Sequence, residues 1–201
     1  MTKDYIESWN NILDEDTLKA NVNFAAMFVL NYECLKESVI SQIREFYSAH
    51  ISFEDKIVYE ESQAYKDEVR SLDENIENAS LKWLIQLDVI TEADYDVYQK
   101  IRKRRNDSTH ELLKNLSEGF VEEDAKLFSE MLSMYSKLDK WWINEIEIPV
   151  SGENIPDDYD KNGVCSGQAI VLSLINSIIL EGKGNHYKNL LKDVLRMNTS
   201  K

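Results

Sequence analysis

The residues of this chain best suited to chemistry are Arg105, Asn106 and His110, which lie within six positions of one another. Arg105 also closes a short basic run, since five of the six residues 100–105 are Lys or Arg. A guanidinium stays charged at any ordinary pH and binds phosphate through a planar fork of donors. An imidazole takes and gives protons near neutral pH. Together these groups can bind a phosphodiester and move its protons without a metal ion.

The segment between the Arg and the His predicts a break between two helices. Residues 106–108 are of types that suit helix caps better than helix interiors, and Ser108 with Glu111 forms the pattern of a capping box. On an uninterrupted helix, Arg105 and His110 would lie about 140° apart around the axis. A break at Ser108 would let both point into one crevice. It would also place His110 in a first helical turn, where the partial positive charge disfavours an imidazolium and free N–H groups bind phosphate oxygens.

This arrangement suits metal-free cleavage of RNA. His110 would act as the general acid–base, Arg105 would stabilise the charge that develops on the phosphorane, and Asn106 would orient the pair. The residues expected to hold flanking phosphates are Arg102, Lys103 and Arg104. Because one imidazole does not easily carry out both proton transfers, we expect two copies of the motif to face each other in a homodimer.

A structural interpretation of the same residues stays open at this point. Arg105 could pair with an acidic neighbour such as Asp107, while His110 merely occupies a first helical turn. The formal net charge of −14 argues against a protein that coats nucleic acid without specificity. The basic run could confine a polyanion to one spot, or it could balance the acidic stretch 54–77.

Composition favours an all-α protein. Only 6 Gly and 2 Pro occur in 201 residues, which is typical of long helices rather than of a turn-rich β fold. No apolar stretch approaches the roughly 18 residues that span a bilayer, and the first residues lack the pattern of a signal peptide. We therefore expect a cytoplasmic protein without a membrane segment. Cys34 and Cys165 lack the spacing of a disulfide framework or zinc site and are expected to be core thiols in a reducing compartment.

Hydrophobic periodicity predicts a helical bundle. The clearest signal is the stripe Phe28, Tyr32, Leu35, Val39, Ile43 and Phe46, and the apolar run Phe24 to Leu30 indicates burial on more than one side. Thr91 is expected to cap a helix that ends near Arg105, and Gly182 to follow the end of another. The predicted helices are 5–18, 21–50, one after a loop within 51–78, 79–90, 92–105, 108–119, 122–148, 164–180 and a short last one through Leu195.

These elements predict one main domain with an addition. Residues 1–148 would form the helical domain, residues 149–163 a loop, and residues 164–201 a C-terminal helical extension packed on the same domain. No group of His, Cys or carboxylates has convincing ligand spacing, so we predict neither a metal site nor a cofactor. His50 and His186 stand outside any such setting and are expected at the surface.

The Arg105-Asn106 pair at the end of a basic helix, followed by His110, resembles the HEPN superfamily (higher eukaryotes and prokaryotes nucleotide-binding domains). The hallmark of that family is an Arg, a polar residue directly after it, and a His four to six residues from the Arg. Residues 87–91 and 95–105 also resemble the helix–turn–helix that leads into this motif. The resemblance covers roughly residues 20–145.

The resemblance implies a metal-independent endoribonuclease that acts as a homodimer in toxin–antitoxin, abortive-infection or other phage-defence systems, with an antitoxin protein as a further partner. Many antitoxin-paired members carry a Tyr two residues after the His. This chain has Leu112 there and so lacks that modification site, and its length points towards abortive-infection relatives. Two alternatives remain. One is a catalytically inactive HEPN-like protein that binds a nucleotide or a protein, and the other is a purely structural helical adaptor.

Overall fold

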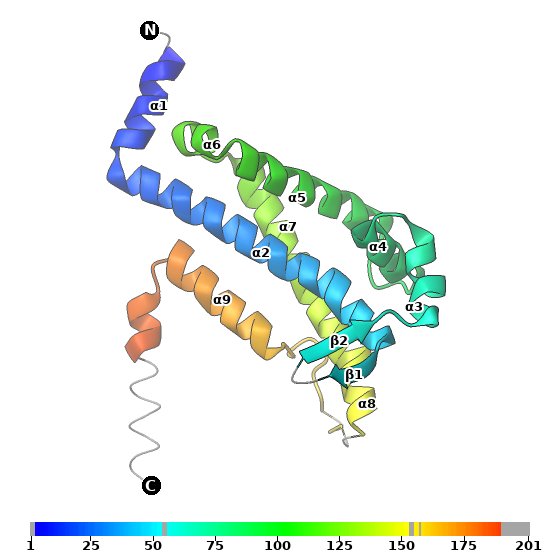
Figure 1. Ribbon diagram of the computed structural model, residues 1–201. Coiled ribbons are helices and arrows are strands. Elements are labelled where there is room, and N and C mark those ends of the chain that lie inside the picture. Colours follow the sequence, from blue (N-terminus) through cyan, green and yellow to red (C-terminus); the bar gives the residue numbers. More distant parts are fainter. Residues whose placement is uncertain (1–2, 54–55, 153–154, 157, 190–201) are drawn as a thin grey trace.

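One long helix, α2 (Glu15–Tyr47), crosses the molecule, and the other helices are arranged around it (Figure 1). The computed structural model describes residues 3–53, 56–152, 155–156 and 158–189. Apart from one β-hairpin, the regular elements are helical, so the predicted all-α fold is confirmed. The remaining elements in chain order are α1 (Lys3–Leu13), β1 (Ala49–Phe53), β2 (Lys56–Glu60), α3 (Gln63–Glu68), the 3₁₀ turn η1 (Arg70–Leu72), α4 (Ile76–Gln86), α5 (Glu92–His110), α6 (Leu112–Glu118), α7 (Glu122–Trp142), the π-helical turn η2 (Ile143–Glu147), α8 (Ile148–Ser151) and α9 (Gly167–Leu180).

The core is built on the apolar stripe of α2. Helices α4, α5 and α7 contact this helix, and the stripe residues Phe28, Leu35, Val39 and Ile43 are at most 1% exposed. Their three- and four-residue spacing places them on one face of the helix, as the sequence predicted. The prediction fails at Phe46, which is 49% exposed because it lies in the last turn of α2, beyond the tightly packed part of the stripe.

The first helix boundary lies earlier than predicted. The side chain of Asp14 accepts a hydrogen bond from the backbone N–H of Thr17 (2.8 Å) and caps α2. The chain therefore divides at Asp14 and not between residues 18 and 21. Helix α1 then folds against α2 and α6, and the Asn11 side chain donates to the backbone oxygen of Ser117 (2.9 Å).

Residues 51–78 differ most from the prediction of a loop followed by one helix. Strands β1 and β2 pair antiparallel, with His50 opposite Tyr59 and Phe53 opposite Lys56. The chain continues through α3 and η1, and α4 begins at Ile76. Each strand has five residues, too few for the alternation of apolar and polar residues to stand out in the sequence. Asn75 caps α4 by accepting from the N–H groups of Glu77 and Asn78, which moves the helix start to an earlier residue than the predicted 79.

The turn into α5 follows the prediction. Thr91 Oγ1 accepts from the backbone N–H of Asp94 (3.2 Å), and the Asp94 carboxylate accepts from the N–H of Thr91 (2.8 Å). This reciprocal capping box fixes where α5 begins. The position depends only on residues three apart, which is why local sequence predicted it.

The C-terminal part is a modified version of the predicted extension. Helix α7 continues through η2 and α8 to Ser151, so the predicted loop begins later than residue 149. Pro149 lies in this continuous run directly after η2, where the backbone N–H of Ile148 bonds to the oxygen of Ile143, five residues back. Helix α9 starts at a Ser166 cap, and Gly182 follows its end as expected, in the left-handed conformation (φ 68°). The predicted last helix lies, from Leu190 onward, outside the described residues.

Helix α9 is fixed to α2 by a buried amide pair. Asn31 and Asn176 exchange two side-chain hydrogen bonds of 2.8 Å. Nearby, Cys34 is half-buried, whereas Cys165 is exposed, so the prediction of two core thiols is wrong for Cys165. Of the helices within the described residues, none is both long and apolar enough to cross a bilayer.

Candidate functional site

The predicted break at Ser108 is absent, and α5 runs on to His110. Ser108 is a buried residue inside α5, and the helix ends where Glu111 leaves helical geometry. His110 is therefore the last residue of α5 and not part of a first turn. The N-terminal N–H groups of a helix begin only at Leu112, in the seven-residue helix α6, so His110 precedes them and does not lie in their turn. The crevice that the break would have created does not form.

Ser108 stays helical because of its tertiary surroundings. It is 2% exposed, and its hydroxyl accepts a hydrogen bond from Arg104 Nη1 (3.0 Å). Because the Ser108 hydroxyl is hydrogen-bonded to a side chain one turn earlier in the same helix, it does not cap a new helix. The capping pattern is a local preference, and it is overridden here by packing against the core.

Arg104, predicted to hold RNA phosphate, instead ties α5 to the start of α7. Its Nε and Nη2 donate to the two carboxylate oxygens of Asp124 (2.5 and 3.0 Å). Its guanidinium also lies over the ring of Phe120, 5.4 Å from the centroid, and within 3.4 Å of Asn115 Oδ1. The side chain is 21% exposed. All three nitrogens of this cation thus donate hydrogen bonds within the protein.

The two partners of this ion pair perturb each other. The hydrogen bond to Asp124 raises the pKa of Arg104. Burial acts to raise the pKa of Asp124, but the bonds from Arg104 and from the backbone N–H of Val121 outweigh it and the pKa falls below its usual range. A bidentate Arg–carboxylate pair of this kind is a strong, directional link.

Arg102 also faces the protein interior. Its Nη1 donates to Asn78 Oδ1 (3.1 Å) and lies 3.7 Å from Glu77 Oε2. The other oxygen of the buried Glu77 accepts from the hydroxyls of Tyr32 (2.6 Å) and Tyr98 (2.5 Å). Burial and this carboxylate raise the pKa of both tyrosines. Arg102 thus neutralises a buried carboxylate between α4 and α5.

Of the three residues predicted to hold flanking phosphates, Lys103 alone points into solvent. Its side chain is 78% exposed, and it pairs with Asp107 one turn later on the same helix (2.5 Å). Such an exposed i,i+4 pair is weak. Lys103 therefore remains accessible to an anion.

Arg105 lies against α2, between the interior and the surface. Its Nη2 donates to the Glu33 carboxylate, and its Nη1 donates to Asn106 Oδ1 (3.2 Å). The guanidinium carbon is 5.4 Å from the centroid of the Tyr32 ring. Its Nε is buried and finds no hydrogen-bond partner among the described residues. The acidic partner is thus Glu33, on another helix, and not the sequence neighbour Asp107.

His110 is exposed at the free end of α5. Because the helix is continuous, His110 and Arg105 diverge by about 140° around its axis. Lys103 and Asn106 lie seven and four residues before His110, so all three fall within about 60° of one another on the exposed side. The structure therefore groups His110 with Asn106 and Lys103 and separates it from Arg105.

An open apolar groove lies beside Arg105. It has a volume of about 650 Å³ and runs between α2 and the junction of α5 with α6. Arg105 and Glu33 are its charged lining residues. The other residues that line it are Val22, Ala25, Ala26, Val29, Leu30, Ser108, Thr109, Leu112 and Leu116. Val22 and Leu112 are each 45% exposed, so the groove presents its apolar wall to solvent.

Sequence reasoning missed Glu33, Asp124 and this groove. Glu33 and Asp124 are 72 and 20 positions from their arginines, and no local spacing indicates either pairing. The groove did leave a signal. The continuous apolar run from Phe24 to Leu30 gives α2 a second apolar face beside its core stripe.

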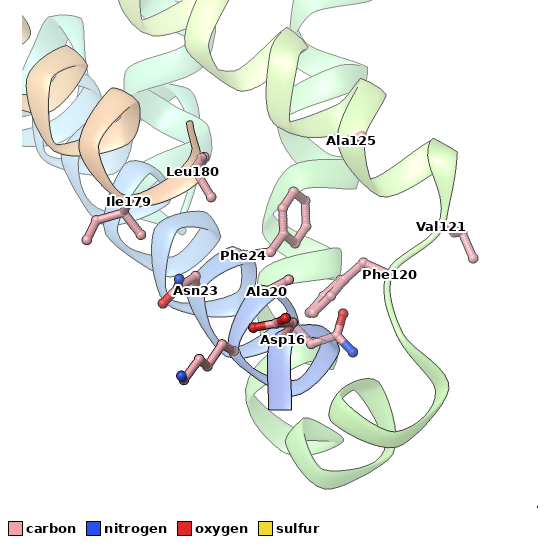
Figure 2. A pocket seen from close by; sticks show the side chains of 11 residues that line it. Asp16, Ala20, Asn23, Phe24, Phe120, Val121, Ala125, Ile179 and Leu180 are labelled. Carbon is pink, nitrogen blue, oxygen red and sulfur yellow. The ribbon is translucent and has the colours of Figure 1, made fainter. Parts of the chain in front are cut away.

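A second apolar pocket lies on another side of α2 (Figure 2). It has a volume of about 580 Å³ and is bounded by α2, α7 and the end of α9. The rings of Phe24 and Phe120 contact each other in it, with their centroids 4.6 Å apart. Ile179 and Leu180 approach the pocket from α9. Lys19 at its edge is paired with Glu15. The ionisable residues that line this pocket are Asp16 and Lys19, and neither His nor Cys is among its lining residues.

No cluster of His, Cys, Asp and Glu with metal-ligand geometry occurs among the described residues. His186 is exposed, as predicted, and His50 lies in β1, where the structure describes no side chains. No protein-family model matches the chain, and no curated protein or solved structure matches it either.

Proposed function

We propose that this protein is a metal-independent endoribonuclease of the HEPN type that acts as a homodimer. His110 is the general acid–base, Arg105 stabilises the anionic phosphorane, and Asn106 orients Arg105 through the hydrogen bond between them. Lys103, on the exposed face with His110, holds a flanking phosphate. Arg102 and Arg104 do not take this role, because each is paired with a carboxylate inside the fold.

The observation that carries this proposal is the open apolar groove with Arg105 in its wall. One subunit holds Arg105 and His110 on different sides of α5, so it does not form a complete site. A second copy seated in the groove would bring its own imidazole towards Arg105. The groove has the character of an interface core, since its lining is apolar and partly exposed.

The His110 imidazoles of two subunits together supply both proton transfers of the reaction. One imidazole removes the proton from a ribose 2′-hydroxyl, and the 2′-oxygen forms a bond to phosphorus. The bond from phosphorus to the 5′-oxygen breaks, and that oxygen takes a proton from the second imidazole. Arg105 stabilises the charge on the non-bridging oxygens. The products carry a 2′,3′-cyclic phosphate and a 5′-hydroxyl.

Cleavage of a synthetic RNA tests the proposal. We expect activity in EDTA, cyclic phosphate ends, and no cutting of a strand with deoxyribose at every position. His110→Ala should abolish cleavage, while His186→Ala, which changes another exposed histidine, should not. Arg105→Lys should be much weaker than wild type, since a point charge replaces a planar fork. Activity that survives His110→Ala, or that is lost in EDTA, overturns the proposal.

A second experiment tests the dimer. Leu112 lines the groove, whereas its neighbour Leu113 is 84% exposed and lies outside it. Leu112→Glu should give a monomer without cleavage activity, and Leu113→Glu should remain a dimer. Analytical ultracentrifugation at micromolar concentration measures both. A wild-type monomer that RNA does not bring together contradicts the homodimer.

The biological role that fits such an enzyme is that of a toxin or abortive-infection effector acting on RNA in the cytoplasm, with an antitoxin protein as partner. Expression of the wild type should arrest growth, and the His110→Ala variant should be tolerated. The pairing of Arg105 with Glu33 favours a second candidate, an inactive relative that binds a nucleotide or a protein. Equal tolerance of both chains, together with absence of cleavage, would favour that candidate.

A further inference from the structure

The guanidinium of Arg105 has one edge held by a carboxylate and one donor unused. Glu33 accepts from Nη2 through one oxygen, Oε1. Nε lies buried without a hydrogen-bond partner among the described residues. Asn106 accepts from Nη1 (3.2 Å), and Tyr32 packs against the guanidinium plane. The edge formed by Nε and Nη2 is therefore only half satisfied.

This edge is the part of an arginine that binds oxyanions best. Two parallel N–H bonds to two oxygens of one phosphate or carboxylate give the strongest geometry. Arg104, the preceding residue, shows that geometry with both oxygens of Asp124. Glu33 accepts through one oxygen, so it takes the place of an oxyanion at Nη2 of Arg105 and leaves Nε without a hydrogen bond.

Glu33 is also free to leave. Its side chain is 43% exposed, against 9% for Asp124, so its carboxylate is already partly hydrated and its ion pair with Arg105 is the weaker of the two. It lies in the wall of the same groove as Arg105. An incoming anion would meet the pair from the solvent side.

We propose that Glu33 is an intramolecular competitor that occupies the guanidinium of Arg105 when no ligand is bound. A phosphodiester oxyanion must displace Glu33 in order to bind Arg105. This inference rests on the proposed function in one respect, since the anion is taken to be an RNA phosphate. Glu33 is a regulatory residue in this scheme and takes no part in the proton transfers. It sets the affinity of Arg105 for phosphate.

Binding of a non-cleavable RNA tests this inference separately from catalysis. A 12-nucleotide RNA with 2′-O-methyl riboses keeps every phosphate but lacks the attacking hydroxyl. We expect Glu33→Gln to bind it roughly tenfold more tightly than wild type, equivalent to about 1.4 kcal/mol. The matched control is Glu37→Gln, which removes the same charge from an exposed position one turn further along α2. It should change the affinity by less than about twofold, because exposed charges are screened.

Two further variants assign the effect to Arg105. The double variant Glu33→Gln/Arg105→Gln should lose the gain entirely. Glu33→Asp, which keeps the charge on a shorter side chain, should also bind more tightly than wild type because it reaches Arg105 less well. Circular dichroism and urea unfolding establish that each variant is folded. If Glu33→Gln does not fold, Glu33→Asp takes its place in the binding experiment.

The outcomes separate this inference from the proposed function. Tighter binding by Glu33→Gln without any cleavage of natural RNA supports the competitor role of Glu33 and contradicts the proposed ribonuclease activity. Cleavage by wild type with equal affinities for Glu33→Gln and Glu37→Gln overturns the competitor and leaves the ribonuclease. A gain that persists in the double variant also overturns it, and so does absence of binding in every variant, because Arg105 would then hold no oxyanion.

Discussion

Arg104 and Arg105 are sequence neighbours with opposite environments. Arg104 meets both oxygens of a nearly buried carboxylate, a serine hydroxyl and an aromatic face. Arg105 meets one oxygen of a half-exposed carboxylate, and its Nε has no hydrogen-bond partner in the part of the chain that the structure describes. Adjacent residues on a helix point about 100° apart, so one faces α7 and the other faces α2. The same residue type is thus a structural link at one position and a candidate functional group at the next.

The difference lies in the partners and not in the arginines. A buried ion pair resists the loss of either member, because the remaining charge has no water to solvate it. A half-exposed pair can exchange its partner for water or for a ligand. Four substitutions or conditions test this contrast, beginning with the largest expected effect.

Removal of the Asp124 charge should cost the most. Asp124→Asn leaves Arg104 without its counter-ion in a buried setting, and we expect the free energy of unfolding to fall by about 3 kcal/mol. Urea unfolding followed by circular dichroism measures this. Asp107→Asn is the matched control, because it breaks the exposed pair with Lys103 and should cost no more than about 0.5 kcal/mol. Equal costs would mean that the two pairs do not differ as described.

Replacement of Arg104 by lysine should cost less. Arg104→Lys keeps the charge but loses the fork that meets both oxygens of Asp124, and it loses the bond to Ser108. We expect a decrease of about 1–2 kcal/mol in the free energy of unfolding. Arg105→Lys serves as the comparison and should change stability by less. A lysine at 104 that is fully tolerated would show that the fork geometry contributes nothing.

Acid should weaken the same link. The pKa of Asp124 is lowered in the folded state, so its ionised form contributes stability above the unfolded-state pKa of about 3.9. That contribution is lost as the pH falls through the lower folded-state value. Below about pH 4, the free energy of unfolding should therefore fall more steeply for wild type than for Asp124→Asn. Parallel curves in urea unfolding across this range would contradict the assignment.

The smallest effect on stability is expected at Glu33. Glu33→Gln breaks a pair whose members are 43% and 29% exposed, and we expect a change of about 0.5 kcal/mol or less. Urea unfolding of this variant beside Glu37→Gln provides the measurement. A loss as large as that of Asp124→Asn would make Glu33 a structural partner and would remove the contrast between the two arginines.

Local rules predicted much of the fold. The stripe from Phe28 to Ile43 needs only helical periodicity, and it is buried as expected. The Thr91 capping box and the left-handed Gly182 each depend on a few neighbouring residues. The β-hairpin at 49–60 was missed because two five-residue strands become regular structure only when they pair.

The candidate site was predictable in its residues but not in its geometry. The sequence by itself determined which groups are available, namely a basic helix with Arg105, Asn106 and His110 near its end. Tertiary structure decided where those groups point. Packing of Ser108 against the core kept α5 continuous, and charges 20 to 72 positions away selected partners for Arg104 and Arg105. Side-chain type and helical spacing are local, whereas burial and ion pairing depend on the segments that the fold brings together.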